Sequence, residues 1–219
     1  MTDSTKTLIA ALLDRSGSMQ RSKAATEDGW SELINGQRAE QGSCEVTLAQ
    51  FDSRYEVLYP PTDIAAVPEF IVNPRGSTAL LDATGRFITE VGERLAALPE
   101  EQRPGTVICL IMTDGMENAS RQWSWDGVKR LITQQREVYG WEFIFLGANI
   151  DAVEVGMRMG VDADSALTFA SDSYHGNREA YRVTSVKMGY ARMQQKRDFS
   201  AADRDAAMGK GDDGVGRAR

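Results

Sequence analysis

The segment that decides the fold is Leu8–Met19, with the sequence LIAALLDRSGSM. Its first half is an apolar run, which is typical of a strand buried on both faces of a parallel sheet. The run ends in Asp14, Ser16 and Ser18, three oxygen-bearing side chains at alternate positions. In an open α/β sheet, the residues after such a strand lie at the carboxyl edge, where these folds keep their binding sites. A carboxylate and two hydroxyls on one turn can hold a hard cation such as Mg²⁺, which takes oxygen ligands in octahedral geometry.

Two other segments offer the same chemistry: Gly76-Ser77-Thr78, and Thr113-Asp114-Gly115 after the apolar run Val107–Met112. The D-x-S-x-S of residues 14–18, the threonine of G-S-T and the aspartate of T-D-G together resemble the von Willebrand factor A (vWA) domain. These are the pieces of its metal-ion-dependent adhesion site (MIDAS). The resemblance covers residues 6–169, and FIFLGANIDA at Phe143–Ala152 resembles the fifth strand of bacterial members.

The resemblance implies a role for each residue of the predicted metal site. Ser16 and Ser18 would bind the ion directly through their hydroxyls, and Thr78 would join them when the site is engaged. Asp14 and Asp114 would act directly or through water and would supply two negative charges. The expected ion is Mg²⁺, with Mn²⁺ or Ca²⁺ as alternatives. Neutral hydroxyls leave such an ion electron-poor, so an Asp or Glu of a protein partner would complete its coordination.

A metal is not the only interpretation of these residues. Aspartate and serine are preferred helix caps, so residues 14–18 could simply start a helix. Thr78 alone could also begin a helix, and Asp114 alone could occupy a turn before Gly115. The conjunction of all three segments favours the metal site.

Several residues near these motifs have other expected roles. Arg15 is predicted to form a salt bridge or a contact at the rim. Asp82 is predicted to cap a helix or to hydrogen-bond a residue that binds the metal. Glu117 and Asn118 could line the rim.

Apolar runs and periodicity predict an alternation of strands and helices along the chain. Strands are predicted at residues 7–13, 45–51, 55–59, 106–113, 141–146 and 166–170, and helices at 19–38, 80–98, 124–140, 152–159 and 177–196. Residues 60–75 contain four prolines and are predicted to lack regular structure. The predicted fold is α/β: a doubly wound, Rossmann-like vWA fold with a six-stranded, mostly parallel sheet, one antiparallel edge strand (55–59) and helices on both faces.

Three regions are predicted along the chain. Residues 6–170 would form the vWA domain, residues 171–196 a C-terminal helical extension that packs on it, and residues 197–219 a polar, glycine-rich tail. Ser200 precedes Asp203 as in a capping box, which predicts a short helix there, and the chain after Gly209 is predicted to be flexible.

Composition narrows the function classes. The net charge of −7 argues against binding to nucleic acid, which needs clustered Lys and Arg. The start of the sequence lacks the features of a signal peptide and no apolar run could span a bilayer, so cytoplasmic residence without membrane contact is expected. Cys44 and Cys109 lie in predicted strands and are expected to be buried and reduced.

The expected function is a stand-alone bacterial or phage-type protein-interaction module, serving for example as an adaptor for a separate AAA+ ATPase. Two alternatives remain: a self-assembling structural or phage-associated component, and a Mg²⁺-dependent phosphatase or hydrolase with Asp14 as nucleophile. His175 is the only histidine, which limits hydrolase mechanisms that need a Ser–His–Asp triad. No catalytic residues are predicted.

Overall fold

In the computed structural model, which describes residues 2–210, six strands form one sheet. The strands are β1 (Asp3–Asp14), β2 (Ser43–Phe51), β3 (Tyr55–Asp63), β4 (Pro104–Thr113), β5 (Glu142–Ala148) and β6 (Ala166–Phe169). Their order is β3-β2-β1-β4-β5-β6, and every neighbouring pair is parallel except β2 with β3. The predicted fold class, with its antiparallel edge strand, is confirmed.

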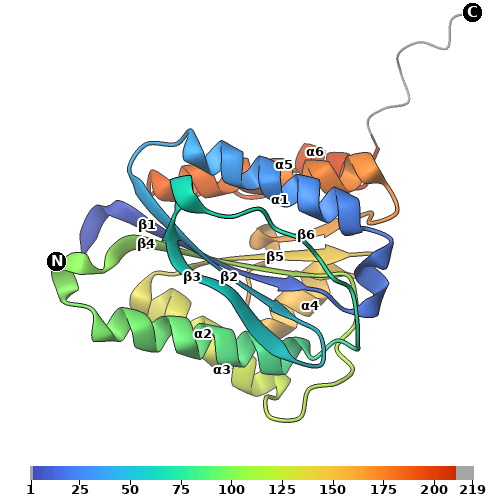
Figure 1. The fold of residues 1–219 in the computed structure, drawn as a ribbon, viewed down its shortest axis with the longest axis horizontal. Coiled ribbons are helices and arrows are strands. Elements are labelled where there is room, and N and C mark those ends of the chain that lie inside the picture. Colours follow the sequence, from blue (N-terminus) through green and yellow to red (C-terminus); the bar gives the residue numbers. More distant parts are fainter. Residues whose placement is uncertain (1, 211–219) are drawn as a thin grey trace, which may run out of the picture.

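Helices cover both faces of the sheet (Figure 1). They are α1 (Lys23–Arg38), α2 (Leu80–Ala97), α3 (Trp125–Tyr139), α4 (Ala152–Met159), α5 (Tyr174–Arg192) and α6 (Ala201–Ala207). The helices α1, α5 and α6 lie on one face, and α2, α3 and α4 lie on the other. The sheet is therefore the middle of three layers.

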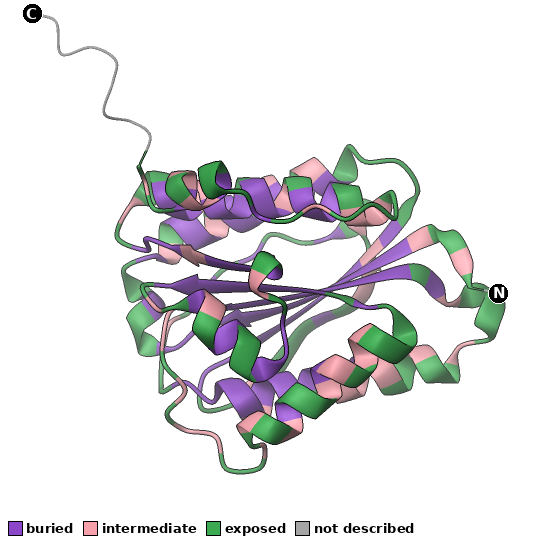
Figure 2. Cartoon of the chain, turned by 180° about the vertical axis from the view of Figure 1, so that it is seen from behind, coloured by how far each residue is buried: buried purple, intermediate pink, exposed green. Residues whose placement is uncertain are grey.

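Strand β1 shows why the sequence needs this arrangement. Ile9 and Leu13 belong to the core under α1, α5 and α6, whereas Leu8 and Leu12 belong to the core under α2, α3 and α4. All four are buried, and Figure 2 shows the same for most of the central strands. An uninterrupted apolar run satisfies both faces at once, since successive side chains of a strand point to opposite sides.

The chain connections diverge at the carboxyl ends of β1 and β4. After β1 the chain continues through α1 on one face, whereas after β4 it continues through α3 on the opposite face. The two loops separate at this point, which is the switch point where open α/β sheets bind ligands. Both the Asp14–Ser18 turn and the Thr113–Gly115 turn begin here.

Two predicted boundaries were wrong in an instructive way. Residues 60–63 continue β3 although Pro60 and Pro61 lie among them, because β3 is an edge strand whose outer side needs no N–H donors. A 3-10 turn at Ile64–Ala66 follows, so the start of the 60–75 segment is regular. Helix α1 begins at Lys23 and not at residue 19, because Gly17–Gln20 forms a separate 3-10 turn.

The C-terminal part packs against the sheet and α1. Helix α5 begins at Tyr174, earlier than predicted, because the Ser173 hydroxyl caps it by accepting from the Gly176 N–H at 3.0 Å. The predicted capping box of α6 is confirmed: the Ser200 hydroxyl accepts from the Asp203 N–H at 3.1 Å, and the Asp203 carboxylate accepts from the Ser200 N–H at 2.9 Å. The predicted flexible end lies mostly at 211–219, outside the described residues. Within 2–210, no helix has both the length and the apolar character that crossing a bilayer requires.

Candidate metal site at the carboxyl edge of the sheet

Asp14 is the fully buried anchor of the candidate site. It is the last residue of β1, and its Oδ1 accepts a hydrogen bond from the Ser16 N–H at 2.6 Å. Its Oδ2 accepts from the Thr113 hydroxyl, at the end of the neighbouring strand β4, also at 2.6 Å. Asp14 thus fixes the turn that follows β1 to the end of β4.

The side-chain oxygen atoms of Ser16, Ser18 and Asp114 come together between the loops that follow β1 and β4. The two serine hydroxyls lie 3.0 Å apart, and the Ser18 hydroxyl donates to Asp114 Oδ1 at 2.7 Å. The Ser16 hydroxyl lies 3.4 Å from the same oxygen. Residues that are almost a hundred positions apart in the sequence therefore share one polar cluster.

Thr78 reaches the same cluster from the loop before α2. A Cβ atom built on Gly115 would lie 3.0 Å from the Thr78 hydroxyl and 3.7 Å from the Ser18 hydroxyl, so these two groups border the space that glycine leaves open. Thr78 is buried, and its N–H donates to the Asn118 side chain at 3.0 Å. All five residues of the predicted site lie together.

The electrostatics of the cluster favour a cation. Burial raises the pKa of Asp14 to about 6, and the nearby charge of Asp114 acts in the same direction. Burial also raises the pKa of Asp114. Among residues 2–210, no basic side chain forms an ion pair with either carboxylate. Two uncompensated carboxylates beside three hydroxyls fit a divalent, oxygen-preferring ion such as Mg²⁺.

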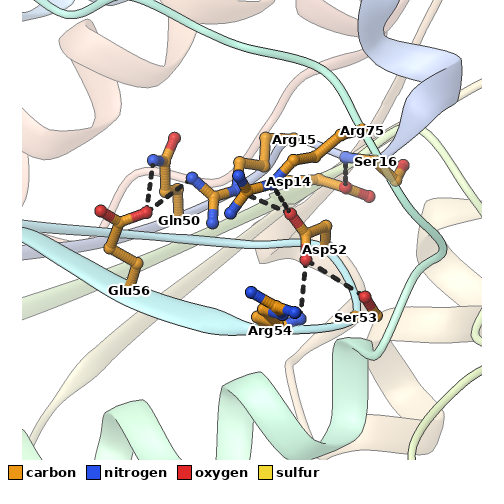
Figure 3. Close-up of polar contacts among 9 residues, drawn as sticks. All are labelled: Asp14, Arg15, Ser16, Gln50, Asp52, Ser53, Arg54, Glu56 and Arg75. Carbon is orange, nitrogen blue, oxygen red and sulfur yellow. Dashed lines mark hydrogen bonds and ion pairs between the residues drawn. The ribbon is translucent and has the colours of Figure 1, made fainter.

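A network of charged groups lies beside the cluster, and of its contacts only a salt bridge or rim contact of Arg15, with no partner named, was predicted (Figure 3). Arg15 is buried; its Nε donates to Asp52 Oδ2 at 2.9 Å and its NH1 donates to Glu56 at 2.6 Å. Arg75 donates to the same oxygen of Asp52 at 2.8 Å. Although burial acts in the opposite direction, hydrogen bonds from Arg75, the Arg54 N–H and Arg15 lower the pKa of Asp52. We call Arg15, Asp52, Glu56 and Arg75 the Arg15 network.

The Arg15 network holds the two loops of the candidate site in place. The Arg75 N–H donates to the Arg15 carbonyl at 2.8 Å, and the Gly17 N–H donates to the Gly76 carbonyl at 3.2 Å. The salt bridge predicted for Arg15 is confirmed. The only sequence signal for Asp52 is that this carboxylate follows β2 at the same edge of the sheet.

Acidic residues around the loop after β4 bind backbone groups. Asp82 was predicted to cap a helix or to support a ligand through a hydrogen bond; it instead accepts from the N–H groups of residues 121, 122 and 123, at 2.7–2.8 Å. Glu117 accepts from the Leu81 N–H at 2.9 Å and from two amides of its own loop. These bonds join that loop to the start of α2, next to Thr78.

Comparison with known proteins supports the fold. By sequence, the chain matches no known family model and no curated protein. Among solved structures, a von Willebrand factor type A structure from Catenulispora acidiphila matches with a TM-score of 0.59 and 15% identity, over 83% of this chain and 42% of that one. The vWF domain of the type V pili tip protein Mfa5 from Porphyromonas gingivalis matches with a TM-score of 0.56 and 10% identity, over 90% of this chain and 98% of that one. The chain has the vWA fold.

The pilus adhesin SpaC from Lactobacillus rhamnosus GG, in an open conformation, also matches, with a TM-score of 0.62 and 12% identity, over 85% of this chain. The chain spans only 30% of SpaC and 42% of the Catenulispora structure. At such identities the likeness establishes the fold alone.

Proposed function

We propose that this chain is a metal-dependent protein-interaction module. The observation that carries the proposal is the convergence of Asp14, Ser16, Ser18, Thr78 and Asp114, from three separate segments, at the switch point of the sheet. The proposed ion is Mg²⁺, with Mn²⁺ or Ca²⁺ as alternatives. When bound, the ion would offer an open coordination position to a carboxylate.

The residues of the site would have different roles in holding the ion. The hydroxyls of Ser16 and Ser18, which already lie within hydrogen-bonding distance of each other, would bind it directly. Asp114 would balance its charge, and Thr78 would close the site when the partner's Asp or Glu is present. Asp14 would act mainly by fixing the turn, because both of its oxygens accept hydrogen bonds from the protein.

This role for Asp14 supports a binding function over phosphatase chemistry. A nucleophilic carboxylate must reach the substrate, whereas Asp14 is fully buried and both of its oxygens are occupied. We therefore propose that the chain is not an enzyme. We further propose that it acts in the cytoplasm on a protein partner, for example a separate AAA+ ATPase, and not on nucleic acid or membranes.

Metal titration tests the proposal. Calorimetric titration of the wild type with MgCl₂, and then with MnCl₂ and CaCl₂, should detect one binding site. Ser18→Ala removes a proposed direct ligand. It should therefore lower the affinity for the metal by at least about 10- to 100-fold, the loss that follows when only a hydrogen-bond partner of a ligand is removed. Ser31→Ala, the same change at an exposed position of α1, is the matched control and should bind as the wild type does. A folded wild type that takes up none of the three ions would refute the metal-dependent function.

A further inference from the structure

A polar groove begins directly beside Thr78. It has a volume of about 810 Å³ and lies between the β2–β3 turn, the start of α2 and the loop at residues 118–122. Its lining includes Arg54, Ser77, Ala79, Arg86, Asn118 and Arg121. Since Ser77 and Ala79 are the chain neighbours of Thr78, the groove and the candidate metal site share one loop.

The groove carries positive charge that the described structure does not neutralise. Arg54 and Arg121 are exposed, and within residues 2–210 neither guanidinium has a hydrogen bond or an ion pair. Arg86 differs, because it donates to Glu90 at 2.8 Å and lies over the Tyr55 ring at 4.5 Å. Two arginines whose guanidinium groups have no partner among residues 2–210 therefore belong to the lining of the groove.

The acids that line the groove are already occupied. Asp52 accepts from Arg15 and Arg75 in the Arg15 network. Asp82 accepts from three backbone amides of the loop that bears Arg121. Neither carboxylate pairs with the free arginines, so the groove is basic in a chain whose net charge is −7. Such a local reversal of sign favours a ligand of complementary charge.

We propose that this groove binds an extended acidic segment of a partner protein. The proposal rests on the metal-dependent function above: one acid of the segment occupies the metal site at the end of the groove, and the acids two and four residues further along the segment contact Arg54 and Arg121. Alternate side chains of an extended segment point the same way and are about 7 Å apart. A segment of the form Asp-x-acid-x-acid can therefore follow the groove away from Thr78.

Two synthetic peptides test the groove. Both carry one aspartate near the amino end; the peptide GDGEGEG adds two glutamates at alternate positions after it, and GDGQGQG replaces them by glutamine. Their affinities for the full chain in MgCl₂ are measured by NMR titration at low ionic strength. The glutamate peptide should bind about fivefold tighter to the wild type, with the difference shrinking in high salt.

Charge-reversal variants assign this preference to the groove. Arg54→Glu combined with Arg121→Glu should abolish the preference for the glutamate peptide, and the milder double change to glutamine should reduce it. Arg130→Glu is the matched control, since Arg130 is exposed on α3 outside the groove and should leave the preference intact. Arg54 and Arg121 are both exposed, so the thermal unfolding of their variants should match that of the wild type.

The outcomes separate the groove from the metal site. If the wild type binds the two peptides equally and EDTA abolishes this binding, the proposed role of the groove is refuted and the proposed metal-dependent function stands. A glutamate preference that needs the arginines but survives EDTA would support the groove and contradict the metal site. The proposed role of the groove would also be refuted if the double variant kept the preference for the glutamate peptide, or if neither peptide bound at millimolar concentration.

Discussion

Replacing Asp14 by asparagine should make the metal-free protein more stable. Asp14 is fully buried, and its pKa is raised to about 6, so at neutral pH the folded chain must hold an ionised carboxylate in an unfavourable place. Asparagine keeps the shape and the acceptor for the Ser16 N–H. Its amide can donate to the Thr113 hydroxyl, which can donate onward to the Gly115 carbonyl at 3.1 Å. The substitution therefore removes a charge without stranding a hydrogen-bonding group.

The magnitude follows from the pKa. The carboxyl has an ordinary value of 3.8 and a folded value of about 6. Each pKa unit corresponds to about 1.4 kcal/mol, so the ionised carboxylate destabilises the folded state by about 3 kcal/mol at neutral pH. Between these two values the folded wild type holds a proton that the unfolded chain has released. The stability of the wild type should therefore fall as the pH rises through about 6, whereas Asp14→Asn should lack this contribution.

Urea unfolding in EDTA measures this difference. At pH 7.5 the free energy of unfolding of Asp14→Asn should exceed that of the wild type by about 3 kcal/mol, and the gap should close near pH 4. Adding MgCl₂ should stabilise the wild type more than the variant, because the variant lacks one of the two negative charges that offset the ion. Asp164→Asn is the matched control, because Asp164 is exposed at the opposite edge of the sheet, before β6. An asparagine variant that is less stable than the wild type in EDTA at pH 7.5 would refute the reasoning.

Three further substitutions test how the site and the C-terminal helices are held. Arg15→Met leaves Arg75 as the remaining ion-pair partner of the buried Asp52, so it should lower the free energy of unfolding in urea by about 1.5–3 kcal/mol; an unchanged midpoint would contradict a buried Arg15 network. Gly29→Ala places a Cβ 2.3 Å from the Tyr181 ring, where α1 meets α5, and should cost about 1–3 kcal/mol in thermal unfolding, whereas no loss would mean that α5 does not pack as described. Ser200→Ala removes the cap of α6 and should cost about 1 kcal/mol; hydrogen exchange at residues 201–207 should speed up, and unaltered exchange there would argue against the cap.

The layers of the fold could be predicted well because strands that are buried on both faces are apolar along their whole length. The strand cores at β1 and β4 are almost wholly apolar, and a sheet covered on both sides buries such runs completely. The boundaries of β3 were less predictable. Proline weakens any local prediction of a strand, and only the position of β3 at the edge of the sheet makes Pro60 and Pro61 acceptable.

The five residues of the candidate site could be predicted because they form short motifs at the ends of strands. The partners of Arg15 could not, because Asp52 and Glu56 lie 37 and 41 positions from it in the sequence and meet it only through the register of the sheet. That register places Asp14 opposite Phe51 on neighbouring parallel strands. The next residues of the two strands, Arg15 and Asp52, must then emerge side by side, and their opposite charges meet.

The same register accounts for the charge of the candidate site. Arg15 follows Asp14 directly, so a different orientation of its side chain would place a guanidinium among the carboxylates and repel a cation. Asp52 and Glu56 instead bind the guanidinium on the side of β2 and β3 (Figure 3). Asp14 and Asp114 are thereby left with two formal negative charges between them, which a single divalent ion would balance. The Arg15 network thus keeps a positive charge away from the proposed metal site and also holds the loops of that site in place.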